Sequence, residues 1–271
     1  MSEKYKPIPG HIFTRWGREV TPENAWQQYP RPQMRRTSWL NLNGLWEYGI
    51  TPRSQQGPSF EGSILVPFPV ESALSGVKRP LSPDQHLWYR RTFTIPESWV
   101  GCRILLHFGA VDWSTRLWLN QVEVGDHRGG FLPFSFDITA FLQTGENEIL
   151  LSVWDPTDQH WVNRGKQVLN PNGIWYTAVS GIWQTVWLEP VPKTYIQSLK
   201  LTPDLDQEIL TIAVVLSGDP HASEVEAVAR DGGKRIAKIR AAPNNPINLP
   251  IPDPHTWSPE DPHLYDLEIN L

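Results

Sequence analysis

Apolar residues recur at every second position in short runs along most of the chain. The segment Cys102–Gly109 is an example, because Ile104, Leu106 and Phe108 fall on one face when it is extended. Such alternation, with Gly, Pro, Asn and Asp between the runs, is typical of β-strands. We expect further strands of this kind at Leu87–Ile95, Thr115–Asn120, Val122–His127, Pro133–Ile138, Glu148–Trp154 and Trp183–Glu189.

Helical periodicity is confined to two short windows, Glu23–Tyr29 and Val70–Ser75. The pair Asn120-Gln121 separates two predicted strands and fits a tight hairpin turn. The chain also carries 26 prolines, roughly twice the usual share, and proline breaks helices but suits loops and strand ends. The fold class that we predict is therefore all-β.

The character of the sequence changes near Pro190–Lys193. Of the 14 tryptophans, only Trp257 follows Trp187. We expect one domain over residues 1–192, a large jelly-roll sandwich, and a second over residues 193–271, a smaller immunoglobulin-like sandwich. The second domain has strand patterns at Tyr195–Thr202, Glu208–Leu216, Glu224–Arg230, Arg235–Arg240 and Leu264–Leu271, with a hairpin turn at Asp231-Gly232-Gly233.

Composition narrows the classes of function. The single cysteine, Cys102, excludes an internal disulfide and a zinc knuckle. A net charge of −5 without a basic stripe argues against nucleic acid as a partner. No apolar run approaches the roughly 20 residues of a membrane helix, and the polar first twenty residues favour a cytoplasmic location. We expect no metal and no cofactor.

The segment Asp155–Thr177 is the best candidate for a functional loop. It is long, polar and aromatic, and long loops without regular structure often carry function. Flat aromatic faces combined with charged and amide groups suit a sugar, whose C–H face packs on a ring while its hydroxyls form hydrogen bonds. The predicted carbohydrate-binding residues are Trp161, Arg164, Lys166, Gln167, Asn172 and Trp175. The alternative is a loop that packs on a catalytic domain or on another subunit.

No residue is predicted to be catalytic. Acidic pairs occur at Asp155 with Asp158, Asp204 with Asp206, and Glu260 with Asp261, all in loop-like sequence, where solvated carboxylates are the usual outcome. A Gly-x-Ser-x-Gly elbow and a His-Glu-x-x-His motif are both absent from the sequence. Asp126 and His127 are adjacent on a predicted strand, which sends their side chains to opposite faces.

An ordered set of motifs resembles the β-galactosidase/β-glucuronidase family, glycoside hydrolase family 2. The resemblance extends from about Trp39 to Leu271 and includes the last part of the second domain, Trp257–Tyr265. The motifs that resemble the sugar-binding domain of the family are Leu42–Trp46, Val66–Phe68, Trp88–Arg91, Val111–Asn120, Val124–Phe134, Phe136–Thr139 and Gly181–Glu189.

This resemblance implies a galactose-binding-like jelly roll followed by an immunoglobulin-like sandwich. Family members hydrolyse O-glycosyl bonds with two glutamates on a (β/α)₈ barrel that follows these domains, so we expect this chain to be a non-catalytic portion, inactive alone. We also expect an incomplete second sandwich, whose unpaired sheet edge and barrel-facing surface would permit self-association.

The sequence departs from the best-known family members at one place. They carry a sugar-contacting acid shortly before a Gly-Ile-aromatic motif, but here Asn170–Trp175 holds no acid. No β-galactosidase or β-glucuronidase specificity is therefore carried over to this chain. Two further hypotheses stay open, a standalone carbohydrate-binding module and a structural or assembly module. Alternation favours Trp113, Trp161, Trp175 and Trp183 for a ligand-facing or barrel-facing surface, and Trp39, Trp46, Trp88, Trp118 and Trp187 for packing.

Overall fold

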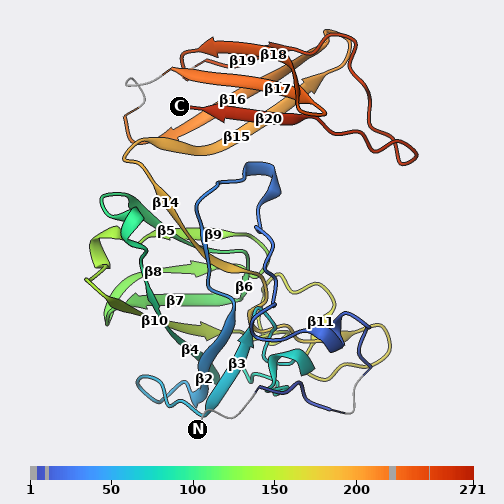
Figure 1. Cartoon of the computed structure of the whole chain (residues 1–271). Helices are drawn as coiled ribbons and strands as arrows, with labels where there is room; N and C mark the ends of the chain where they lie inside the picture. The colour runs from blue at the N-terminus through green and yellow to red at the C-terminus, as the bar shows by residue number, and fades with distance from the viewer. Residues whose placement is uncertain (1–4, 10–11, 220–223, 244) are drawn as a thin grey trace. The chain divides into compact units, whose positions relative to one another are not determined.

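The computed structural model describes residues 5–9, 12–219, 224–243 and 245–271. The chain divides into two compact units, Met1–Pro190 and Val191–Leu271 (Figure 1). The described residues form β-strands and five short 3₁₀ helices, which confirms the predicted all-β class. These helices are η1 (Gly17–Glu19), η2 (Pro32–Met34), η3 (Ala73–Ser75), η4 (Glu97–Trp99) and η5 (Thr139–Phe141).

Two sheets make up most of the first unit. The larger has the strand order β3-β2-β4-β10-β7-β8, and the smaller has the order β1-β14-β5-β9. The strands of the larger sheet are β2 (Gly44–Pro52), β3 (Gly62–Val66), β4 (Gln85–Thr94), β7 (Ser114–Leu119), β8 (Val122–Arg128) and β10 (Glu146–Trp154). Those of the smaller sheet are β1 (Leu40–Asn41), β5 (Arg103–Phe108), β9 (Phe134–Asp137) and β14 (Val186–Val191).

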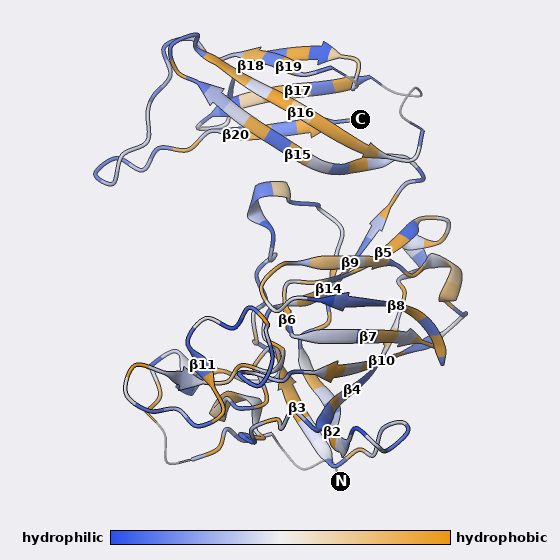
Figure 2. Cartoon of the chain, turned by 180° about the vertical axis from the view of Figure 1, so that it is seen from behind, coloured by the Kyte–Doolittle hydropathy of each residue, from blue (hydrophilic) through white to orange (hydrophobic). Residues whose placement is uncertain are grey.

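Apolar side chains of both sheets form one core. Trp46, Tyr89 and Phe108 are among its largest fully buried residues, and the Trp46 and Tyr89 rings meet edge to face at 6.3 Å. The Trp46 indole N–H donates to the Leu42 carbonyl at 2.8 Å, which satisfies its buried polar group. Orange and blue segments alternate along the strands in Figure 2, as the sequence pattern predicts.

Two very short strand pairs complete the first unit. Strands β6 (Val111–Asp112) and β13 (Gly181–Ile182) pair antiparallel, with Asp112 opposite Gly181. Strands β11 (Gln167–Val168) and β12 (Tyr176–Thr177) pair parallel within the long loop. These pairs decide which side chains of the loop meet the body of the unit.

The hairpin prediction at Asn120-Gln121 is confirmed. Both residues have left-handed backbones, with φ of 49° and 70°, and β7 and β8 pair antiparallel on either side. Two central residues with positive φ match the twist of the flanking strands, and asparagine tolerates this conformation better than most residues.

Both helix predictions need correction. Residues 23–29 form turns, because Trp26 has a φ of 49°, and the Asn24 side chain bonds the Thr21 N–H and the Glu19 carbonyl. Such local side-chain bonds compete with helical ones. In Val70–Ser75 only η3 forms; Ser72 caps its start, and left-handed Gly76 ends it.

The second unit is a sandwich of two small sheets, with the orders β15-β16-β19 and β18-β17-β20. Its core includes Ile212, Val225, Ala227 and Leu249. Gly232 and Gly233, with φ of 52° and 83°, make the predicted turn between β17 and β18. The strands are β15 (Tyr195–Asp204), β16 (Ile209–Ser217), β17 (Val225–Asp231), β18 (Lys234–Ala241), β19 (Ile247–Pro250) and β20 (Asp266–Asn270).

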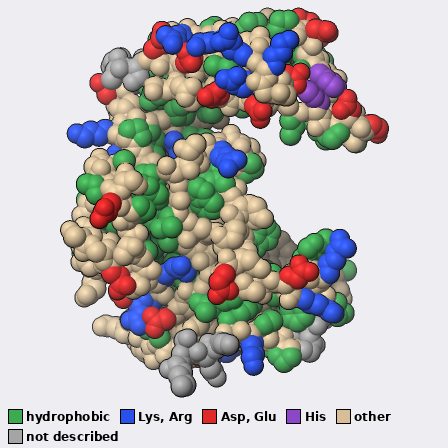
Figure 3. Space-filling model, viewed as in Figure 1, with side chains coloured by type: hydrophobic (Ala, Val, Ile, Leu, Met, Phe, Trp, Pro, Cys, Tyr) green, Lys and Arg blue, Asp and Glu red, His purple; other side chains and the backbone are tan. Residues whose placement is uncertain are grey.

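Strands β18 and β20 are the two edges of one of these sheets. Strand β18 carries Lys238 and Arg240, which both lie 2.7 Å from Glu226, and blue and red side chains lie among one another on this unit in Figure 3. Charged side chains blunt an edge against pairing with another chain. Strand β20 pairs with β17 and with no second strand among the described residues, and its Leu267 and Ile269 are partly buried against the core.

Candidate functional site

Both ends of the long loop Asp155–Thr177 are held by one buried carboxylate. Asp155 follows the last residue of β10 and is only 2% exposed. One of its oxygens accepts from the Thr157 N–H at 2.7 Å, and the other accepts from the Ser180 hydroxyl at 2.6 Å. The residues before and after the loop are thereby fixed against each other, although the loop itself is largely exposed.

Two further buried carboxyls hold the returning end of the loop. Glu71 accepts from the Ser180 N–H at 2.9 Å through Oε2, while its Oε1 is buried without a hydrogen-bond partner. Asp112 accepts from the side-chain amide N–H of Gln167 at 3.2 Å, and the side-chain oxygen of Gln167 accepts from the Val179 N–H at 2.6 Å. Gln167 therefore bridges the body of the unit and the backbone that ends the loop.

Glycine at position 181 permits this close approach. Gly181 has a φ of 83°, and a Cβ added there would collide with the Tyr89 hydroxyl. The Tyr89 hydroxyl lies within hydrogen-bond distance of the Ile182 N–H, at 3.2 Å. Glycine has no Cβ and adopts this left-handed conformation readily. The chain can therefore pass close to Tyr89 immediately after Ser180.

Burial raises the pKa of all three carboxyls. Burial raises the pKa of Glu71 to about 7, and the charge of Asp155 adds to the rise. Burial also raises the pKa of Asp112 to about 7, with repulsion from Asp155 and Glu71 in support. The pKa of Asp155 is raised by burial too, but hydrogen bonds from Ser180 and Thr157 oppose the rise. Glu71 and Asp112 therefore gain and lose protons near neutral pH.

Within the described part of the chain, no three His, Cys, Asp or Glu residues are arranged to hold a metal ion. The same residues contain no helix long and apolar enough to cross a membrane. The carboxyl cluster holds the loop through the hydrogen bonds that it accepts from Thr157, Gln167 and Ser180.

The outer surface of the loop presents aromatic rings beside cations. Trp161 is fully exposed at 106%, and Tyr176 is 66% exposed. The Arg164 guanidinium lies 5.9 Å from the centre of the Trp175 ring, and the Lys166 ammonium lies 5.8 Å from that of Tyr176. The β11–β12 pairing brings these side chains together, since it sets Gln167 opposite Tyr176.

The structure thus does not gather the predicted site residues in one place. Arg164, Lys166 and Trp175 gather beside the β11–β12 pair. Trp161 lies with Arg164 on the wall of a shallow hollow of about 1100 Å³ formed by residues 158–165. Asn172 is exposed and donates to the Asn170 carbonyl at 3.2 Å, and Gln167 points inward to Asp112.

The structure places four of the acidic residues noted in the sequence. Asp155 is buried, whereas Asp158 accepts from its neighbour Gln159. Asp204 caps a turn by accepting from Gln207, and Asp261 lies 2.6 Å from His255. The cluster of Glu71, Asp112 and Asp155 was missed because its members are far apart in sequence. The strand pairing that brings Asp112 opposite Gly181 forms only in the folded chain, so the sequence pattern did not signal it.

Comparisons with known proteins agree with this architecture. Residues 51–192 match the family model described as "Glycosyl hydrolases family 2, sugar binding domain", and residues 194–271 match "Glycosyl hydrolases family 2". The chain is 26% identical over 296 residues to a β-glucuronidase from Sus scrofa, covering 94% of this chain and 45% of the relative. It is also 26% identical over 196 residues to a β-galactosidase from Thermoanaerobacter pseudethanolicus, covering 68% and 26%.

Among solved structures, the fold is similar to a β-glucuronidase from Ruminococcus gnavus in complex with uronic deoxynojirimycin. The TM-score is 0.71 at 20% identity, over 89% of this chain and 43% of that one. The chain spans less than half the length of these relatives. Because family models match residues 51–192 and 194–271, which together make up well over half of the chain, the chain belongs to glycosyl hydrolase family 2.

Proposed function

We propose that this chain is the non-catalytic portion of an enzyme that hydrolyses O-glycosyl bonds in carbohydrate metabolism. The match of both units to family 2 domains supports this proposal. Its two β-sandwich units would support a catalytic barrel and contribute to the rim of that barrel's active site. The hydrolytic carboxyl pair would lie on the barrel, because a retaining mechanism needs two carboxyls about 5–5.5 Å apart across one sugar linkage.

The loop surface carries the proposed contact with carbohydrate. The single observation behind it is that Arg164 and Lys166 each lie over an exposed ring, while buried carboxyls fix the loop from beneath. A pyranose ring stacks on such aromatic faces, and cations and amides bond its hydroxyls. Trp161 and Trp175 would stack on sugar rings, Arg164, Lys166 and Asn172 would bond hydroxyls, and Gln167 would fix the loop through Asp112.

The first test concerns hydrolysis. The purified chain is expected to leave nitrophenyl β-D-glucuronide and β-D-galactoside intact, which are the two linkages named by its relatives. A longer protein from the same gene that includes a barrel is expected to cleave a nitrophenyl glycoside. Robust turnover by the 271-residue chain alone overturns the proposal.

The second test concerns the loop in the active, longer protein. Trp161→Ala and Trp175→Ala are expected to lower kcat/KM by about tenfold each, the equivalent of one lost stacking contact of roughly 1.4 kcal/mol. Trp257→Ala is the matched control, since Trp257 is 57% exposed and lies in the second unit. Equal kcat/KM for all three variants would show that the loop does not contact the carbohydrate substrate.

An assembly role is the second candidate, favoured by the edge of β20 and by exposed apolar side chains such as Leu264, 78% exposed. Self-association through that edge predicts a molar mass that rises with concentration in sedimentation experiments. Glu268→Pro changes a β20 residue that lies opposite Val228, and it would interrupt such pairing. A constant monomer mass counts against this role.

A further inference from the structure

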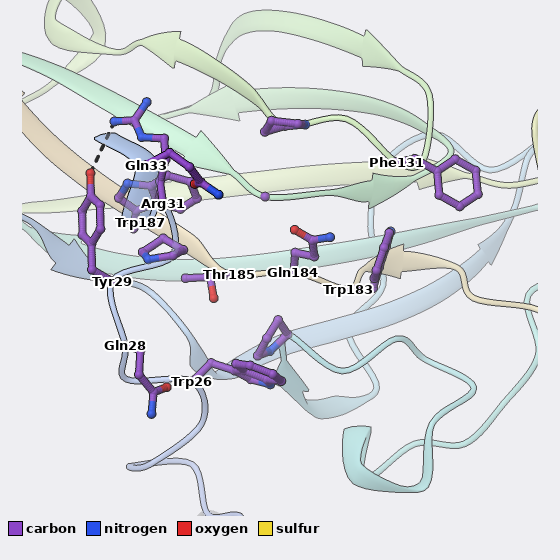
Figure 4. A pocket seen from close by; sticks show the side chains of 14 residues that line it. Trp26, Gln28, Tyr29, Arg31, Gln33, Phe131, Trp183, Gln184, Thr185 and Trp187 are labelled. Carbon is purple, nitrogen blue, oxygen red and sulfur yellow. Dashed lines mark hydrogen bonds between the residues drawn. The ribbon is translucent and has the colours of Figure 1, made fainter. Parts of the chain in front are cut away.

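A second recessed site lies in the first unit, away from the long loop. It is a pocket of about 700 Å³ between the segment 26–33 and the bend that precedes β14 (Figure 4). This volume falls within the usual range for sites that enclose a small organic ligand. The residues that matter for its chemistry are Trp26, Gln28, Gln33, Phe131, Trp183 and Gln184.

Trp26 is held in this pocket in a strained conformation. Its φ is 49°, a left-handed backbone that bulky residues rarely adopt. Its carbonyl accepts from the Asn41 side chain at 2.8 Å and from the Asn43 side chain at 3.2 Å, which fixes the backbone. The indole is nevertheless 58% exposed. Strain that supports an exposed ring, instead of burying it, points to a role for that ring at the surface.

Trp183 and Phe131 form a second aromatic part of the lining. The Trp183 indole N–H donates to the Gly130 carbonyl at 2.7 Å, and the Phe131 ring meets Trp183 edge to face at 6.2 Å. Trp183 precedes β14, because the chain bends at Trp183–Thr185 before the strand begins at Val186. The predicted strand at Trp183–Glu189 therefore starts three residues late, and those residues line the pocket instead.

Three of the polar side chains that line the pocket are uncharged amides. Within the described residues, the side-chain amides of Gln28, Gln33 and Gln184 make no hydrogen bond, so they are available to a ligand. The one cation of the lining, Arg31, lies 2.9 Å from the fully buried carboxylate of Glu189, which also pairs with Arg36. Aromatic walls with amide donors and acceptors suit a neutral sugar, whose hydroxyls both donate and accept, and the cation of the lining is already engaged by Glu189.

We propose that this pocket binds a neutral glycan, with Trp26 as the stacking platform, Trp183 as a second aromatic wall and the three glutamine amides as hydroxyl partners. The segment 26–33 lies before residue 51, where the match to the sugar-binding domain model begins. The site is separate from the loop Asp155–Thr177, and it adds a place where glycan is held without being cleaved.

The test uses the whole chain and an array of neutral and acidic oligosaccharides, followed by titration calorimetry with the best neutral binder. The wild-type chain is expected to bind neutral glycans in preference to uronate-containing ones. Trp26→Ala is expected to weaken the calorimetric Kd about tenfold or more, the loss of one aromatic stacking contact. Trp257→Ala, which changes a 57% exposed ring in the second unit, is the matched control and is expected to leave that Kd unchanged.

A second variant separates function from folding. Trp26→Gly relieves the left-handed strain, so it is expected to keep or raise Tm while abolishing glycan binding. A fall in Tm with Trp26→Gly, or unchanged binding, overturns the proposal.

The two proposals fail in different ways. Loss of binding with Trp161→Ala but not with Trp26→Ala assigns the glycan to the long loop and overturns the pocket alone. No binding to any array glycan at millimolar concentration also overturns it, and if sedimentation then shows dimers that Trp26→Ala disrupts, the pocket is a contact between copies. Neither result bears on hydrolysis by the longer protein.

Discussion

The Ser180 hydroxyl donates a hydrogen bond of 2.6 Å to Asp155, from a position 25 residues further along the chain. The Ser180 N–H donates to Glu71, which comes from a third segment. Ser180, which immediately precedes Gly181, thus bonds two buried carboxyls at once. The exposed loop between Asp155 and Ser180 is anchored from below, and its stability is coupled to the protonation of these carboxyls.

Ser180→Ala is expected to lower the free energy of unfolding of the first unit by about 1.5–3 kcal/mol, since the lost hydrogen bond serves a buried, ionisable group. Tryptophan fluorescence in urea reports on this unit, because every tryptophan except Trp257 lies within it. Limited proteolysis is expected to cut the loop faster. Ser135→Ala, at an exposed position of β9, is the control, and equal stability of the two variants contradicts the prediction.

The carboxyl cluster makes stability depend on pH. The pKa of Glu71 is raised by burial from 4.5 to about 7 in the folded chain. The folded state therefore holds its proton more tightly than the unfolded state does, and this contribution to stability is complete below pH 4.5 and lost as pH rises through about 7. Asp112 acts in the same direction.

Glu71→Gln tests this linkage. A neutral amide oxygen still accepts from the Ser180 N–H, so the variant is expected to flatten the fall in unfolding free energy between pH 5 and pH 8, by about 1.4 kcal/mol per pKa unit removed. Urea unfolding at a series of pH values provides the measurement. A slope as steep as that of the wild type excludes Glu71 as a source of the dependence.

Glu189 is expected to behave in the opposite way. It is fully buried and lies 2.9 Å from Arg31 and 3.0 Å from Arg36. Burial alone would raise its pKa, but His107, Tyr29 and Trp187 outweigh burial and lower the pKa to about 2. Its contribution to stability is therefore present above pH 4.5 and lost as pH falls toward 2.

Glu189→Gln leaves both arginines without their counter-charge and is expected to cost about 3 kcal/mol, since breaking one partner of a buried pair leaves an uncompensated charge. The segment that carries Arg31 and Arg36 is expected to exchange its amide hydrogens faster, as measured by mass spectrometry. Glu61→Gln removes a more exposed ion pair with Arg79 and is expected to cost under about 1 kcal/mol. Similar losses for the two variants would refute the distinction.

Gln167 offers a test of loop positioning by charge. Gln167→Ala removes the bridge between Asp112 and the Val179 N–H and is expected to cost about 1–2 kcal/mol. Gln167→Glu adds a fourth carboxyl beside Asp112. Above pH 7 it is expected to lower the unfolding free energy more than Gln167→Ala does, and below pH 5 the two losses are expected to be similar. Thermal unfolding of both variants at the two pH values checks the order, and the reverse order contradicts it.

Alternation in the sequence was sufficient to predict the strands that form the core. Residues 102–109 contain β5, and residues 148–154 lie within β10, because a strand with a buried face needs apolar residues at every second position. The other face of β5 was not foreseen: Leu105 and His107 are each 6% exposed. The ring centres of His107 and Trp187 stack at 4.7 Å. The sequence pattern alone does not indicate that a polar residue such as His107 will be covered by a neighbouring element.

By itself, the sequence determined the all-β class, the left-handed turn at Asn120-Gln121 and the family, since each follows from residue type and order along a short stretch. Only the tertiary structure decided that Glu71, Asp112 and Asp155 share one buried cluster and that Trp26 faces the pocket of Trp183. Those neighbours come from segments far apart in the chain, and their meeting depends on strand pairing and on burial. Neither a residue's type nor its sequence spacing contains that information.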